Sequence, residues 1–176
     1  MQNKQISFRK TIDAGTFGEQ FIKCILERAG IRCWKNPEAT NKSVMIKWDL
    51  GAEFPGGFKF TLEVKFDQME AITGNVAVEY FNVRQGKPSG ILATTSNLWV
   101  FVLGDPLTAW VCRTKDLREW FESKPCHREI SRGGDGNAAM KLYRRDELFK
   151  ALFTRIDNLG PWDVSCVLKQ KLELSR

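Results

Sequence analysis

Histidine and paired cysteines are scarce in this chain. His127 is the only histidine, and the five cysteines are widely spaced, with no Cys-x-x-Cys pair. Zinc ribbons and iron–sulfur sites need clusters of these ligands, so the sequence disfavours both kinds of site. Cys126 directly precedes His127, but a Cys–His nucleophile also needs an orienting partner that the sequence does not indicate. We therefore interpret the pair as a loop histidine beside a reduced cysteine.

Long apolar runs and a nucleotide-binding loop are missing as well. No apolar run reaches the roughly 18 residues that cross a membrane, and residues 1–5 lack the apolar region of a signal peptide. A phosphate-binding loop would require Gly-Lys-Ser/Thr, which Gly86-Lys87-Pro88 does not supply. We expect a soluble cytoplasmic protein, in the host cytoplasm if the chain is viral, that makes no membrane contact.

The remaining composition is typical of one globular domain. The chain has 176 residues, 43% of them apolar, and contains no repeat, low-complexity tract or linker. We expect a single domain over residues 1–176, with a core at about 13–113 and an extension at 114–176 that holds helices and a basic loop. The net charge of +6 suits a polyanionic partner such as DNA, although proteins that bind no nucleic acid also carry such a charge.

One stretch, at 47–66, combines the periodicity of strands with charged residues. In its second half, apolar and polar residues alternate as in a half-buried strand, so Glu63 and Lys65 project from the same face. Residues 44–50 alternate in the same way, and a glycine-rich bend separates the two runs. Pairing of these two strands can bring Asp49 alongside Glu63.

Two carboxylates and a lysine on one face suit a divalent metal and a water molecule. Carboxylate oxygens are the ligands that a hard cation such as Mg²⁺ prefers, and Mn²⁺ can substitute for it. We expect Asp49 and Glu63 to ligate the metal, and Lys65 to hold or deprotonate the attacking water.

These residues resemble the PD-(D/E)xK nuclease superfamily. The matching pieces are Asp49, the triplet Glu63-Val64-Lys65 and a preceding helix that carries Glu19, while Trp48 replaces the proline of the motif. The resemblance implies an α/β, restriction-endonuclease-like fold with an α-β-β-β-α-β core, in which helices flank a central mixed sheet. It also implies that the Val64 carbonyl joins the metal site and that Glu19 adds a carboxylate. The alternative for Glu19 is a solvated helix glutamate.

Residues 75–91 resemble a phage-type, Holliday-junction-resolvase-like subgroup of the same superfamily. In that subgroup, a strand that ends in an acidic residue is followed by a turn into a helix. Glu79 would then lie beside the metal, and the backbone N–H groups at Ser89 and Gly90 would hold a DNA phosphate at the start of the helix. Alternatively, Glu79 pairs with Arg84 and Ser89 is only an N-cap.

The predicted order of elements agrees with this fold. We expect helices at 13–29, 91–97, 114–123 and 145–157, and strands at 31–34, 44–50, 59–66, 75–81, 98–103, 108–112 and 138–143. The run at 98–103 is apolar throughout, as in a central strand. The strands at 44–50, 59–66 and 75–81 would supply the three consecutive strands of the core.

The stretch at 124–137 is basic and rich in glycine. Such a loop can follow a phosphate backbone closely, because glycine has no side chain to hinder the approach. A mobile hairpin loop is the alternative. The cations that we expect to bind DNA are Lys87, Lys124, Arg128 and Arg132.

The expected function is hydrolysis of DNA phosphodiester bonds in repair, recombination or phage genome processing, on single-stranded or branched DNA. Two alternatives stay open: a non-catalytic nucleic-acid-binding module with the same fold, and a restriction endonuclease that reads a short duplex sequence. Resolution of a four-way junction would need two active sites, and hence a homodimer.

Overall fold

The computed structural model describes residues 14–40, 47–133 and 136–174. The helices are α2 (Ala14–Arg28), α3 (Glu70–Thr73), α4 (Gly90–Ala93), α5 (Thr114–Ser123), α6 (Arg145–Leu152) and α7 (Pro161–Lys171), with a 3-10 turn at Pro37–Thr40. The strands are β1 (Arg32–Lys35), β2 (Leu50–Glu53), β3 (Lys59–Asp67), β4 (Asn75–Asn82), β5 (Lys87–Pro88), β6 (Leu98–Gly104), β7 (Leu107–Arg113), β8 (Arg128–Gly133), β9 (Ala138–Arg144) and β10 (Thr154–Arg155). Within the described ranges, no helix is both long and apolar enough to cross a membrane.

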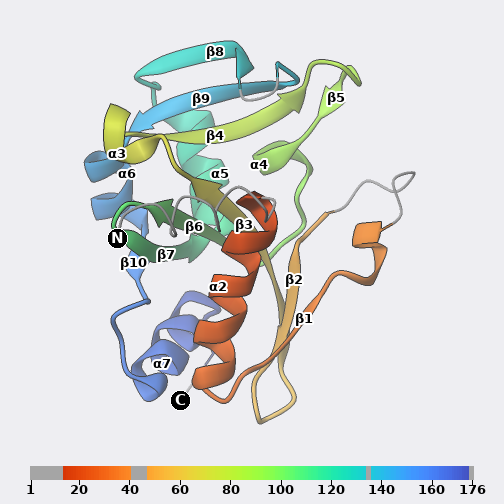
Figure 1. Cartoon of the computed structure of the whole chain (residues 1–176), viewed down its shortest axis with the longest axis vertical. Coiled ribbons are helices and arrows are strands. Elements are labelled where there is room, and N and C mark those ends of the chain that lie inside the picture. Colours follow the sequence, from red (N-terminus) through yellow and green to blue (C-terminus); the bar gives the residue numbers. More distant parts are fainter. Residues whose placement is uncertain (1–13, 41–46, 134–135, 175–176) are drawn as a thin grey trace, which may run out of the picture.

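The strands form two sheets. A six-stranded sheet has the order β1-β2-β3-β6-β7-β10, and a four-stranded sheet has the order β5-β4-β9-β8. The larger sheet is mixed, because β3 and β6 run parallel whereas its other neighbours are antiparallel. Figure 1 shows α2 along the front of the larger sheet and the smaller sheet above it. A central mixed sheet flanked by helices is therefore present, as predicted.

Each face of the larger sheet carries its own apolar core. On one face, alternate residues of β3 and β6 pack against α2 and α7. On the other face, Trp99, Phe101 and Leu103 of β6 pack against α5, α6 and β4. The alternation predicted for 59–66 is correct, since Phe60, Leu62 and Val64 are buried in the first core. Glu63 and Lys65 consequently lie on the opposite face, level with Trp99 and Phe101 of β6.

The predicted bend at 51–57 is only partly correct. Residues 41–46 lie outside the described ranges, and β2 begins at Leu50 and runs through Gly51. The glycine serves close packing: a Cβ at Gly51 would lie 2.4 Å from the ring of Trp34 on the neighbouring strand. The turn itself comes later, at 55–57, where Gly57 has a φ of +85°.

The predicted three-strand order of the core is wrong for 75–81. This segment forms β4, which pairs with β5 and β9 in the smaller sheet, so the larger sheet takes β1, β2 and β3 before it receives β6. The pairing of β4 depends on β9, more than 50 residues further along the chain, and local periodicity carries no information about it.

The helix predicted at 91–97 is a single turn at Gly90–Ala93, since Thr94 is already extended with ψ at 142°. The helix predicted at 145–157 ends at Leu152, where the chain turns into β10. Part of the predicted basic loop forms β8. Residues beyond 113 supply strands to both sheets.

Candidate functional site

Asp49, Glu63 and Lys65 lie together at the point where β2 begins beside β3. The Lys65 Nζ is 2.7 Å from the Glu63 Oε1. Asp49 precedes β2, its backbone N–H donates to the carbonyl of Leu62, and its Oδ2 accepts a 2.7 Å hydrogen bond from the Val64 N–H. The backbone of β3 thus ties Asp49 to the strand that carries the other two side chains.

The two carboxylates are crowded and poorly solvated. Glu63 is only 7% exposed, and Asp49 is half-buried. Burial, and next the negative charge of Glu63, raise the pKa of Asp49 from 3.8 to about 6, although Lys65 and the Val64 N–H act in the opposite direction. Bringing a positive charge between the carboxylates would relieve this repulsion.

Lys65 is held in its charged form. Burial alone would lower the pKa of its ammonium group, but Glu63 and Asp49 outweigh that effect and raise the pKa above its ordinary value. The ammonium also lies 5.5 Å from the centroid of the Trp99 ring. A protonated ammonium at this position can hold a water molecule or a phosphate oxygen, which is the first of the two predicted roles. The second role, deprotonation of the water, stays a prediction.

Glu19 and Glu79 lie near this centre but have other partners. Glu19 forms a 2.7 Å ion pair with Lys35 of β1, and its charge still contributes to the raised pKa of Asp49. The Glu79 Oε1 accepts a 2.7 Å hydrogen bond from the Ser89 hydroxyl, instead of the predicted alternative pairing with Arg84. Their roles as metal ligands stay predictions.

The turn before α4 differs from the predicted phosphate site. Ser89 uses its N–H on the Tyr80 carbonyl and its hydroxyl on Glu79, and it makes no side-chain cap. Gly90 has a φ of +49° and packs on the backbone of Glu79, where a Cβ would lie 2.2 Å from the carbonyl oxygen. A one-turn helix with its leading amide already bonded is a poor anion site. Lys87 is exposed on β5.

The other predicted DNA contacts lie away from the carboxylates. Arg128 and Arg132 are exposed on β8, which β9 separates from β4, and two strand spacings amount to about 10 Å. Lys124 is exposed after α5, with its ammonium 5.8 Å from the Trp120 ring centroid. These cations could bind a phosphate backbone only at a distance from the site.

Two further side chains, which sequence reasoning missed, hold the site in place. Asn36 is 4% exposed, donates from Nδ2 to the Trp48 carbonyl, and donates from its backbone N–H to the Asp49 carbonyl. Thr94 is 5% exposed and donates a 3.0 Å hydrogen bond to the Glu63 Oε2. The only available signal was the polar run at 94–97, directly before an apolar strand.

The donor set suits Mg²⁺ or Mn²⁺. In the described ranges, no three acidic, histidine or cysteine side chains are grouped so as to hold a metal ion. Magnesium often takes only one or two carboxylates and completes its shell with water, and each carboxylate has about four lone-pair positions. Asp49 and Glu63, with a backbone carbonyl such as that of Val64, therefore fit this ion.

The cysteines and the histidine lie outside this centre. All five cysteines are free, and Cys126 and His127 follow α5 in the connection to β8, across the smaller sheet. This placement agrees with a loop histidine beside a reduced cysteine.

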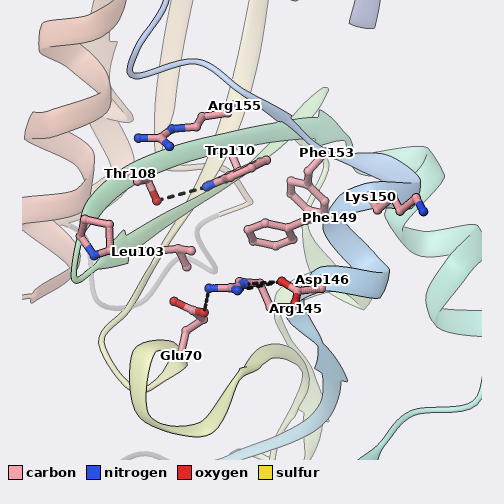
Figure 2. A pocket seen from close by; sticks show the side chains of 11 residues that line it. Glu70, Leu103, Thr108, Trp110, Arg145, Asp146, Phe149, Lys150, Phe153 and Arg155 are labelled. Atoms are coloured by element: carbon pink, nitrogen blue, oxygen red, sulfur yellow. Dashed lines mark hydrogen bonds and ion pairs between the residues drawn. The ribbon is translucent and has the colours of Figure 1, made fainter.

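A pocket of about 560 Å³ lies elsewhere, between α3, α6 and β7 (Figure 2). Figure 2 shows Trp110, Phe149 and Phe153 along its wall, and these three rings pack on one another. Arg145 pairs with Glu70 and Asp146. The two carboxylates at this rim thus already have a cationic partner in Arg145.

Comparison with known proteins adds little. Neither a protein-family model nor a curated protein matches the chain. One solved structure that it resembles is the bacterial homing endonuclease I-Ssp6803I, with a TM-score of 0.48 and 15% sequence identity, over 60% of this chain and 70% of that chain. A likeness of this extent assigns neither a family nor an activity, so function has to be inferred from the side chains of the site.

Proposed function

We propose that this protein is a metal-dependent deoxyribonuclease that hydrolyses phosphodiester bonds. The observation that supports the proposal is the grouping of Asp49, Glu63 and Lys65, in which two crowded carboxylates and a charged lysine meet where β2 begins beside β3. A purely structural ion pair would need one carboxylate, whereas the second raises the electrostatic energy of the folded protein.

Each residue has a distinct part in this proposal. Asp49, Glu63 and the Val64 carbonyl would hold Mg²⁺ or Mn²⁺, which when bound offsets the negative charge that builds up on the phosphate in the transition state. Lys65 donates hydrogen bonds to the attacking water or to a phosphate oxygen, and orients it for in-line attack. The negative charge of Glu79 also contributes to the raised pKa of Lys65.

The proposed substrate is single-stranded or branched DNA, in repair, recombination or phage genome processing. The net charge of +6 supports a polyanionic partner. Cleavage of a four-way junction would need two copies of the site, and hence a homodimer.

The experiment is a panel of fluorescent DNA substrates: single strand, duplex, flap and four-way junction. Each is incubated with purified protein in Mg²⁺, Mn²⁺, Ca²⁺ or EDTA, beside an Asp49→Ala, Glu63→Ala double variant that serves as a contamination control. We expect cleavage in Mg²⁺ and Mn²⁺ only, and none by the double variant. Binding without cleavage would indicate a non-catalytic module, and cleavage restricted to a duplex sequence would indicate a restriction endonuclease.

A further inference from the structure

The Thr94 hydroxyl touches both segments that carry the catalytic carboxylates. It lies 3.0 Å from the Glu63 Oε2 and 2.8 Å from the backbone carbonyl of Lys47, two residues before Asp49. Thr94 itself follows α4, in the connection that carries the chain from the smaller sheet back to β6. One buried side chain therefore contacts both Glu63 of β3 and the segment that leads into Asp49.

The hydrogen bonds around Thr94 direct its proton toward Glu63. A hydroxyl has one proton and two lone pairs. The Lys47 carbonyl already accepts a 2.9 Å hydrogen bond from the Thr95 N–H, so it remains bonded when the Thr94 proton points to the carboxylate. A bond to an ionised carboxylate is also stronger than one to a neutral carbonyl.

A buried chain of hydroxyls supports this orientation. The Ser96 N–H donates to the Thr94 oxygen, and the two hydroxyl oxygens are 3.1 Å apart. The Ser96 hydroxyl lies 3.0 Å from that of Thr114, which is 1% exposed. When Thr94 gives its proton to Glu63, Ser96 can supply the proton between their oxygens, and Thr114 can in turn supply Ser96.

The backbone of Thr94 is also fixed. Arg118 of α5 donates from Nη2 to the Thr94 carbonyl and from Nε to the Ile91 carbonyl, at 3.0 and 3.2 Å. The hydroxyl is thus presented from a rigid support and not from a free loop.

We propose that Thr94 is a positioning residue, which sets the orientation of the Glu63 carboxylate. This inference rests on the proposed function, because the orientation matters only if Glu63 holds a cation. Without the hydroxyl, Glu63 keeps its bond to Lys65 but loses the contact on Oε2, and its carboxylate is free to rotate away from the position of a shared cation.

The test compares Thr94→Val, which keeps the shape and removes the hydroxyl, with Thr94→Ser, which restores it. Mn²⁺ affinity is measured by isothermal titration calorimetry on metal-free protein, and the Mn²⁺ concentration for half-maximal cleavage is measured beside it. We expect Thr94→Val to weaken Mn²⁺ binding about 10- to 100-fold, as is typical for residues that orient metal ligands, and Thr94→Ser to bind like the wild type.

Thr108→Val is the matched control, because Thr108 is 4% exposed and its hydroxyl accepts from the Trp110 Nε1 on the same sheet, away from the carboxylates. Its Mn²⁺ affinity should equal that of the wild type. If Thr94→Val does not fold, Ser96→Ala replaces it, with a weaker loss expected.

If Thr94→Val binds Mn²⁺ as tightly as the wild type, the proposed role of Thr94 is overturned; the same holds for Ser96→Ala where that variant is used. Cleavage by the wild type in the same series leaves the proposed function standing. Equal losses in Thr94→Val and Thr108→Val also overturn the role, since they indicate a general structural effect. A wild type that neither binds Mn²⁺ nor cleaves DNA overturns both.

Discussion

The crowding of Asp49 against Glu63 leads to a quantitative prediction: Asp49→Asn should stabilise the metal-free protein at neutral pH while it abolishes cleavage. The raised pKa of Asp49, about 6 instead of 3.8, means that ionisation is less favourable in the folded than in the unfolded chain. At 1.36 kcal/mol per pH unit, this difference corresponds to about 3 kcal/mol.

The amide removes the charge and keeps an oxygen that can accept from the Val64 N–H, so the packing should change little. Because Asp49 is only half-buried, solvent screens part of the repulsion. We expect a gain of about 1–2 kcal/mol in the free energy of unfolding at pH 7.5, measured by urea unfolding in EDTA.

The difference in stability between the wild type and Asp49→Asn should depend on pH. A carboxyl whose pKa is raised by folding contributes stability below its unfolded pKa, and this contribution is lost as the pH rises through the folded pKa. The wild type should therefore lose stability relative to Asp49→Asn between about pH 4 and pH 6, and the gap should stay constant above that window. Added Mg²⁺ should narrow the gap, because the cation binds the folded wild type alone.

Asp157→Asn is a control with the opposite sign. Burial alone would raise the pKa of Asp157, but hydrogen bonds from Arg155 and the Ala109 N–H lower it. Its contribution is present above the unfolded pKa and is lost as the pH falls through the folded pKa, so this variant should be less stable at pH 7.5 and converge with the wild type in acid. An Asp49→Asn protein no more stable than the wild type at pH 7.5 would refute the account of the site.

Three further predictions concern catalysis, packing and binding. Lys65→Ala should lower the single-turnover rate about 10²-fold and change DNA affinity in Ca²⁺ by less than about tenfold; the reverse pattern would make Lys65 a phosphate clamp. Gly51→Ala should lower the free energy of unfolding by about 1–3 kcal/mol, because its Cβ would clash with Trp34, whereas Gly56→Ala, in open space, should have little effect; equal values would exclude the clash. Arg132→Ala should weaken DNA binding and reduce its salt dependence by about one counterion, with the saturated rate unchanged. A variant with the affinity and salt dependence of the wild type would place Arg132 outside the DNA path.

The elements that the sequence predicted well are those whose signal is local. The alternation in β3 and the uniform burial of β6 follow from the chemistry of consecutive residues, and with them the placement of Glu63 and Lys65 on one face. The pairing of β2 with β3 followed as well, because only a turn separates the two strands.

The errors arose where partners lie far apart in the chain. The sheet to which β4 belongs is decided by β9, and Gly51 is explained by the Trp34 ring on another strand. The contacts of Thr94 with Glu63 and Lys47 span 31 and 47 residues, so no window of sequence could show them.

The division of the smaller sheet between two distant segments has a consequence for dissection of the protein. β4 and β5 come before β6, whereas β8 and β9 come after α5. A fragment that stops at residue 113 would keep Asp49, Glu63, Lys65 and Thr94 but would leave the long edge of β4 without its partner strand. Unpaired edges of this kind recruit other chains, so such a minimal fragment should self-associate instead of folding into a small nuclease. A circular permutation with new termini between β8 and β9 deletes no strand, so it should be tolerated better than truncation at residue 113.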